Sequence, residues 1–237
     1  MNRLYEAQKI DIGLVSQALN NTNATGRYFA MKDYGSALAI LNGGAMAATK
    51  TTKIEVFEAS DEDGTGAQLI SGATATITAN TNVTKATIAL ATVLNGEAIV
   101  INGLTFTAHT DTTTAADREF KIDGDDTADA AALAGLINDA TYGVPGVTAA
   151  ANTGTITLTV DDPGSRVLTI SSEDATFTIA TVEAQAYVEL DDFDLSDGFT
   201  HIACKVTTTA NSNVAVVLLR GKPDGAVTQK VGASASI

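Results

Sequence analysis

The sequence contains one cysteine and no tryptophan, and aromatic residues make up only 5% of the chain. The lone Cys204 cannot form an internal disulfide, so no oxidising compartment is implied, and a buried thiol is its expected state. The shortage of aromatic rings removes the usual stacking platform for sugars. No apolar run approaches the roughly 20 residues that cross a bilayer, and the N-terminal residues form no apolar signal sequence. We therefore expect a protein folded in a cytoplasm, without a membrane partner.

Basic residues are scarce as well. The chain has 14 lysines and arginines against 28 aspartates and glutamates, which gives a formal net charge of −14. A charge of this sign repels phosphate backbones, so direct binding of nucleic acid is disfavoured. It also favours solubility at high local concentration.

Residues for nucleophilic or general-base catalysis are few, because the only histidines are His109 and His201. Cys204 follows His201 by three residues, and on a strand this spacing sends the two side chains to opposite faces. A Cys–His dyad is therefore a poor geometric prospect. We predict that the protein is not an enzyme and that it has no catalytic or cofactor-binding residues.

Two acidic stretches are candidates for a metal site. Residues 123–127 and 61–64 hold carboxylates dense enough for calcium, but neither has the twelve-residue EF-hand pattern. Asp125 and Asp126 serve more simply as helix caps, and Asp63-Gly64 as a turn. The Asp-rich residues 191–194 resemble a solvated loop more than a glycosidase pair. We expect no metal site, with a structural calcium as the alternative.

Both ends of the chain have the alternating texture of strands. Lys53–Glu58 and Ala186–Leu190 alternate, and Ile202, Cys204 and Val206 share one face of another strand. Asn42-Gly43-Gly44 predicts a tight turn. The continuous apolar run Val214–Leu219 predicts a central strand buried on both faces.

The middle of the chain mixes strands with one helix. Asn102-Gly103 predicts a hairpin turn, and Ile156, Leu158 and Val160 fall on one face of a strand. A helix is expected from Asp126 to about Asp139, because apolar residues recur at helical spacing. Its buried face is predicted to contain Leu133, Leu136, Ile137 and Ala140.

These patterns predict a mainly β fold with four parts. Residues 1–28 form an extended arm that orders only against a partner or against its own body. Residues 29–80 and 183–222 build an antiparallel β-sandwich or jelly-roll-like body. Residues 81–182 form a small inserted α+β module, and residues 223–237 a loose tail.

Several segments resemble structural proteins encoded in the head-gene region of tailed phages. They cover about half the chain and keep their order: 27–34, 37–48, 54–66, 186–195, 198–202 and 214–220. The middle of the chain resembles a repeat of flagellin, hook-associated and phage virion proteins, at 101–103, 134–138, 146–149 and 154–158. Modules of the second kind decorate the outer surface of filaments or particles.

The resemblance implies a virion protein, assembled in the host cytoplasm, that stabilises the head by binding capsid subunits. Its partners would be the major capsid protein or other virion proteins, and further copies of itself. The candidate partner-binding residues are aromatic: Tyr5, Tyr28, Phe29 and Tyr34. A tail, neck or head-fibre component is the alternative, and a carbohydrate-binding surface protein is a second one.

Overall fold

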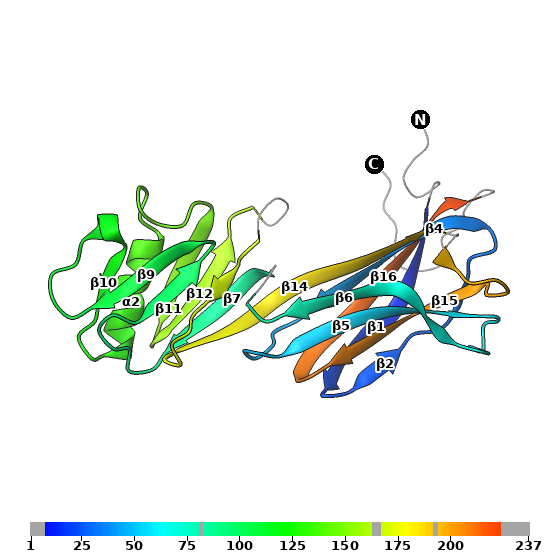
Figure 1. The fold of residues 1–237 in the computed structure, drawn as a ribbon, viewed down its shortest axis with the longest axis horizontal. Coiled ribbons are helices and arrows are strands. Elements are labelled where there is room, and N and C mark those ends of the chain that lie inside the picture. The colour runs from blue at the N-terminus through cyan, green and yellow to red at the C-terminus, as the bar shows by residue number, and fades with distance from the viewer. Residues whose placement is uncertain (1–7, 81–82, 163–166, 192–193, 224–237) are drawn as a thin grey trace. The chain divides into compact units, whose positions relative to one another are not determined.

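The computed structural model describes residues 8–80, 83–162, 167–191 and 194–223. Strands account for 58% of the residues that the structure describes, and they pair mainly antiparallel, so the expectation of a mainly β protein is confirmed (Figure 1). The described residues contain one α-helix, α2 (Asp126–Ile137), and one 3-10 turn, η1 (Ala115–Asp117). Within these residues no helix has the length and hydropathy of a membrane span.

The strands follow one another along the chain with short connections. They are β1 (Gln8–Asn20), β2 (Asn23–Thr25), β3 (Phe29–Ala30), β4 (Tyr34–Gly43), β5 (Thr51–Ala59), β6 (Gln68–Thr78), β7 (Val83–Leu90), β8 (Ala98–Ile101), β9 (Leu104–His109), β10 (Glu119–Lys121), β11 (Val147–Asn152), β12 (Thr155–Val160), β13 (Ile170–Ser171), β14 (Phe177–Asp191), β15 (His201–Thr208) and β16 (Asn211–Pro223).

The chain divides into two compact units. The first unit takes its described residues from Met1–Gly43, Thr51–Ile77 and Gln185–Ile237, and the second from Gly44–Lys50 and Thr78–Ala184. The long strand β14 begins in the second unit and ends in the first. Residues 44–50 had been assigned to the body from sequence, and the structure groups them with the second unit. In place of a tight turn at Asn42–Gly44, β4 continues to Gly43, and Met46 bridges to Thr181 of β14.

The first unit joins the two ends of the chain. Within it, β1, β16, β4 and the C-terminal part of β14 lie side by side, and β2, β15, β5 and β6 form a second sheet. Strand β1 pairs antiparallel with β16 from Gln8 opposite Gly221 to Asn20 opposite Asn211. The short strand β3 also pairs with β15.

Residues 8–20 form a strand, β1, that is ordered against the body of the first unit by its pairing with β16. The pairing of β1 shifts register between Ile12 and Leu14 and again between Leu14 and Gln17, which breaks the two-residue period of a regular strand. Its inward positions at the N-terminal end also carry polar residues, Lys9 and Asp11. Both features hide the strand from a search for alternating hydrophobicity.

The two sheets of the first unit touch at glycines. A Cβ placed on Gly13 of β1 would lie 3.3 Å from the Sγ of Cys204 on β15. A Cβ on Gly26 would lie only 1.7 Å from the carbonyl oxygen of Gly13. The amide of Gly26 also donates to the Cys204 carbonyl at 2.9 Å. Only glycine permits this approach of three backbone segments.

The apolar run in β16 is central in its sheet, between β1 and β4, as expected. Val214, Val216 and Leu218 are buried, but Val217 is 36% exposed. The prediction of burial on both faces is wrong, because in this chain only one face of β16 is covered.

In the second unit, α2 packs on β11, β12, β7 and β10. The carboxylate of Asp125 caps the helix by accepting from the Thr127 amide at 2.9 Å. Leu133, Leu136 and Ile137 are buried as predicted, whereas Ala140 is exposed because the helix ends at Ile137.

Other local predictions in this unit are also confirmed. Asn102 and Gly103 have φ angles of 48° and 78°, and they join β8 to β9 in a tight hairpin. Ile156, Leu158 and Val160 are buried along β12.

We expect the change Gly26→Ala to destabilise the first unit by about 1–3 kcal/mol or more, because the added methyl group meets backbone atoms. The matched change Gly35→Ala is expected to be nearly neutral, since its Cβ would only reach ordinary contact with Lys222 at 3.4 Å. Cys204 is the sole cysteine and is buried in this unit, so pulsed thiol labelling across a denaturant series reports its unfolding. Equal denaturation midpoints for the two variants would show that the close contact of Gly26 with the Gly13 carbonyl does not affect stability.

Candidate functional site

An uncharged surface of aliphatic side chains lies on the outer side of β1, β16 and β4. Antiparallel register places its members in two rows across the three strands. We call this surface the aliphatic face; one row is Ile10, Leu219 and Leu38, and the other is Ile12, Val217 and Ile40.

The aliphatic face is open to solvent. Ile10 is 41% exposed, Ile12 is 49% exposed, and the three neighbours on β4 and β16 other than Val217 are half-buried. Monomeric proteins rarely leave adjacent aliphatic residues uncovered in this way, and such patches mark interaction sites. Sequence analysis missed this face because Ile10 and Ile12 lay in the supposed arm.

A buried ion pair on the opposite side of the same strands sets this orientation. The guanidinium of Arg220 donates to Oδ2 of Asp11 twice, from Nη2 at 2.7 Å and from Nε at 2.9 Å. Both side chains are at least nine-tenths buried. Arg220 Nη1 also donates to the carbonyl oxygen of Ala30. With Asp11 and Arg220 turned inward, the alternation of side chains turns Ile10, Ile12 and Leu219 outward.

Strand β14 extends the outer surface beyond β4. Gln185 donates through Nε2 to Oδ1 of Asn42 at 2.7 Å, which places Gln185 beside the end of the aliphatic face. The two-residue period of β14 then puts Tyr187 and Glu189 on the same side. Tyr187 is 67% exposed, and Glu189 is exposed as well. This edge of the face is therefore aromatic and acidic.

The edge of the face along β1 is a shallow groove. It has a volume of about 470 Å³, and Ile12, Val15 and Arg27 are among its lining residues. Val15, in the bulged part of β1, is 61% exposed. Arg27 is also exposed, so this edge is apolar and basic.

Two of the candidate partner-binding aromatics surround the buried arginine. The Arg220 guanidinium lies 4.3 Å from the ring centre of Tyr34 and 5.5 Å from that of Phe29. Arg27 covers Phe29 at 4.6 Å. Phe29 is only 5% exposed, so its ring packs within the first unit. These rings therefore make cation–π contacts with an arginine inside the first unit.

The other two aromatics differ. Tyr28 is half-buried, and its ring lies against Gly64, where a Cβ would come within 2.6 Å of Tyr28 Cε2. Burial raises the pKa of the Tyr28 hydroxyl. Tyr5 lies outside the described residues.

Cys204 and His201 do not form a reactive pair. Cys204 is buried against Gly13, and burial raises the pKa of its thiol to about 12. The His201 ring, half-exposed, has its Nδ1 2.9 Å from the Thr200 hydroxyl. The thiol is thus protonated and enclosed at neutral pH.

The acidic stretches serve local backbone structure. Asp61 lies in a turn, where hydrogen bonds from Thr65 first, and then from the Asp63 amide, lower its pKa. No group of three metal-binding side chains in metal-binding geometry occurs among residues that the structure describes.

Asp129 is the exception among these acids. It is 1% exposed, and its Oδ1 accepts from the Asp123 amide at 2.9 Å, while Oδ2 is buried without a hydrogen-bond partner. Burial raises its pKa, and the neighbouring carboxylates of Asp123, Asp126 and Asp125 add to the effect. Asp129 lies in the first turn of α2, where the helix dipole favours negative charge, but its burial opposes the ionised form.

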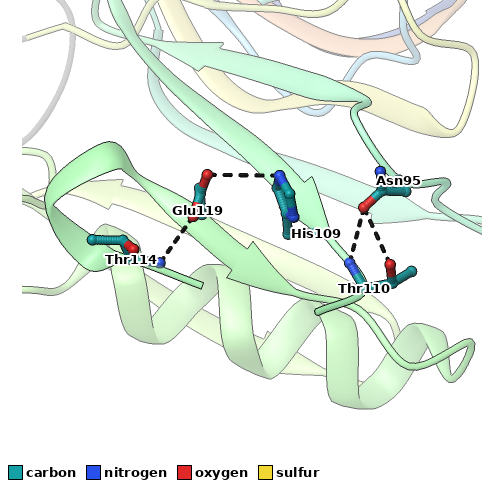
Figure 2. A network of polar contacts seen from close by, with 5 residues as sticks. All are labelled: Asn95, His109, Thr110, Thr114 and Glu119. Carbon is teal, nitrogen blue, oxygen red and sulfur yellow. Dashed lines mark hydrogen bonds and ion pairs between the residues drawn. The ribbon is translucent and has the colours of Figure 1, made fainter. Parts of the chain in front are cut away.

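In the second unit, a network of polar contacts holds the loop between β9 and β10 (Figure 2). Glu119 Oε1 lies 3.6 Å from Nε2 of His109, and its Oε2 accepts from the Thr114 amide at 2.9 Å. Asn95 Oδ1 accepts from the amide of Thr110 at 3.0 Å. These contacts close the loop around His109, whose Nδ1 is buried without a hydrogen-bond partner.

The aliphatic face thus stands out because adjacent aliphatic side chains on neighbouring strands are exposed or only half-buried. Comparisons with known protein families, with curated proteins and with solved structures find no match to this chain.

We expect Arg220→Met to cost the first unit about 3–5 kcal/mol, because it leaves the Asp11 carboxylate buried without its partner. The double variant Asp11→Leu with Arg220→Met removes both charges, and it should recover much of that loss. Cys204 labelling in denaturant measures both. A double variant as unstable as the single one would mean that the two charges are not coupled.

The change Asp129→Asn should stabilise the second unit at neutral pH. A raised pKa means that the folded state binds the proton more tightly, so the wild-type protein loses stability as pH rises from the ordinary value of 3.8 through the raised pKa. The advantage of the variant therefore grows across that window and is constant above it. The helical circular dichroism signal, which α2 supplies, follows this unit during denaturation.

Asp139→Asn is the matched control with the opposite sign. Hydrogen bonds from the amides of Tyr142 and Thr141 lower the pKa of Asp139, so loss of its charge should reduce stability above that pKa. Stabilisation by both changes would point to general relief of negative charge and not to the burial of Asp129.

Proposed function

We propose that this chain is a structural protein of a tailed-phage particle, a capsid decoration protein that binds capsid subunits and stabilises the head. The aliphatic face carries the proposal. The chain has a net charge of −14, yet this surface consists of adjacent uncharged aliphatic side chains. Such a surface favours contact with a partner, because removing apolar side chains from water is favourable.

The choice of particle draws on the resemblance to head-region proteins. Segment 37–48 contains Leu38 and Ile40 of β4, and segment 214–220 contains Val217 and Leu219 of β16, so the resemblance covers four of the six residues of the aliphatic face. Segment 186–195 contains the part of β14 that borders the face. The resemblance therefore falls on the surface that this proposal uses.

The proposal includes the finer architecture. The first unit is a β-sandwich body that attaches to the particle, and the second unit is an α+β module inserted into it. The contact of Gly13 with Cys204 between the sheets supports the sandwich, and the chain order of the two units supports the insertion. In this proposal the first unit binds the particle, and the inserted module is displayed on the particle surface.

The mechanism is binding without chemistry. Each copy adds contacts between capsid subunits, and many modest contacts act together on a repeating lattice. The acidic surface keeps copies soluble before they assemble. The partners are the major capsid protein or other virion proteins, and the protein resides in the virion.

The test is binding of the purified protein to emptied, expanded shells of the phage that encodes it. We expect saturable co-sedimentation and a higher temperature of shell disruption. Ile12→Thr combined with Val217→Thr keeps β-branched residues in both strands but makes the face polar, and it should weaken shell binding at least about tenfold.

Leu69→Thr is the control, because Leu69 lies on β6 in the other sheet and is 39% exposed. This variant should bind shells like the wild-type protein. Saturable binding to isolated tails and not to shells would favour the tail or neck alternative. Binding to neither would refute the proposal.

A further inference from the structure

The sheet that contains β5 and β15 ends at β6, which has β5 as its neighbour among the described strands (Figure 1). An edge strand presents main-chain donors and acceptors to which another extended chain can bind. Strand β6 has 11 residues and contains neither a charged residue nor a proline. It is therefore a long edge without the residues that usually prevent the addition of a strand.

The other edge strands in the described part of the chain are protected against such pairing. Strand β1 has two register shifts and turns Lys9 and Asp11 inward. Strands β2 and β10 have three residues each, β13 has two, and β11 packs against α2. Short length, bulges, inward charges and a covering helix are the devices by which folded proteins block their sheet edges. Strand β6 lacks them along most of its length.

One irregularity near the start of β6 is followed by a regular segment. Gly72 has a φ angle of 79°, and Ile70 and Ala73, on either side of it, are both buried. This three-residue spacing marks a bulge, because side chains of a regular strand alternate every two residues. After Ala73 the alternation returns, with Thr74 and Thr76 exposed. The second half of β6 is thus regular enough to pair.

We infer that β6 pairs antiparallel with β6 of a second copy of this chain, about a two-fold axis perpendicular to the sheet and near the middle of the strand. The pairing joins two sheets into one and keeps the inward side chains of both copies on the same face. Both strands are already extended, so pairing costs less ordering than the capture of a flexible peptide. The inference goes beyond the proposed function and does not depend on it.

The charges at the two ends of β6 match in the antiparallel arrangement. Glu62 and Asp63 are exposed in the turn before β6. Lys50 is exposed, and its carbonyl oxygen accepts at 3.1 Å from the amide of Ala79, the residue that follows β6. Antiparallel pairing brings the acidic turn of each copy to the end at which its partner carries Lys50. Parallel pairing would place the two acidic turns side by side, where they repel.

The middle of the pair brings no like charges together, because β6 itself is uncharged. On the neighbouring strand β5, the ammonium of Lys53 lies 2.6 Å from Oε1 of Glu55, so these two charges offset each other. Copies with a net charge of −14 repel one another least where their surfaces are uncharged. A second copy therefore meets less repulsion at β6 than at the acidic turns.

The length of β6 sets the expected strength. Eleven paired residues extend for about 36 Å, and the contact is one strand wide, which places the pair among small, reversible interfaces. The two-fold pairing uses the free edge of both copies. Assembly through β6 therefore stops at the dimer and does not continue into a fibre.

The first experiment is sedimentation velocity of the full chain from about 5 to 500 μM, a range that brackets a weak dimer. Wild-type protein should show a reversible monomer–dimer equilibrium without larger species. Thr74→Lys places two lysines near the axis and should weaken association about fivefold to tenfold, because like charges on paired strands repel. It also lowers the net negative charge, so the loss would not come from stronger general repulsion.

Thr157→Lys is the matched control with the same change of charge. Thr157 lies on β12, which is paired on both sides, and its cross-strand neighbours Ala150 and Thr87 are uncharged. This variant should associate like the wild-type protein. A dimer weakened equally by both changes would not be formed through β6.

Cross-linking tests the orientation and gives an independent measurement should the lysine variant not fold. Cys204 is buried with a thiol pKa of about 12, so Thr74→Cys adds the single reactive thiol. Near the axis, two such thiols are opposite or diagonal neighbours at most about 8 Å apart, and a short bis-maleimide should join them. Two Leu69→Cys thiols, near one end of β6, would be about 27 Å apart and should stay unlinked.

Several results would overturn the pairing. One is a wild-type protein that stays monomeric up to about 1 mM, well above the affinity expected for a small interface. Another is a dimer that Thr74→Lys does not weaken and that neither cysteine variant cross-links. Equal cross-linking of Thr74→Cys and Leu69→Cys would indicate parallel strands and refute the two-fold axis perpendicular to the sheet.

The shell assay separates this inference from the proposed function. A monomeric protein that binds shells keeps the decoration role but refutes the pairing. If that binding is lost in Thr74→Lys, a strand of the capsid subunit occupies β6 in place of a second copy. A protein that pairs as described but binds no particle keeps the pairing and refutes the role.

Discussion

The buried ion pair between Asp11 and Arg220 fixes how the two ends of the chain pair. The two residues are 209 positions apart, yet their side chains meet inside the first unit. A buried pair of charges contributes little net stability, but it tolerates no arrangement in which one partner is missing. Because side chains alternate along a strand, a shift of β1 by one residue would turn Asp11 to solvent and Ile10 and Ile12 inward. The ion pair and the exposed aliphatic face are therefore two results of one register.

Arg220 also connects the sheets of the first unit. It extends from β16, donates to the carbonyl of Ala30 in β3, and lies over the rings of Phe29 and Tyr34. Since β3 pairs with β15, the guanidinium ties the sheet that contains the aliphatic face to the sheet behind it. Phe29, taken from sequence as a contact for a partner, is instead part of the arginine's surroundings. Its aromatic character is explained by the cation it covers.

Local signals in the sequence were sufficient for the elements that depend on neighbours along the chain. The capped helix α2, the Asn102-Gly103 turn and the alternating strand β12 were all predictable, because propensity and periodicity act over a few residues. Strand β1 was not, since two register shifts break its period and the inward positions at its N-terminal end, Lys9 and Asp11, are polar. Nor could the run Val214–Leu219 reveal which of its faces is covered. The composition of an apolar run does not tell which of its two faces is covered. The pairing of β16 with β1 and β4 sets which side chains of the run point inward and which point to solvent.

The strong negative charge gives the aliphatic face its selectivity. Copies with a net charge of −14 repel one another in most orientations, so hydrophobic contact alone would not choose a partner or a geometry. Repulsion is weakest where the charge of the surface is locally zero or reversed, and both conditions meet at this face and at Arg27. Rejection of other orientations contributes as much to specificity as the attraction itself. A surface that is uncharged and apolar at its centre therefore favours partners that are also uncharged and apolar there.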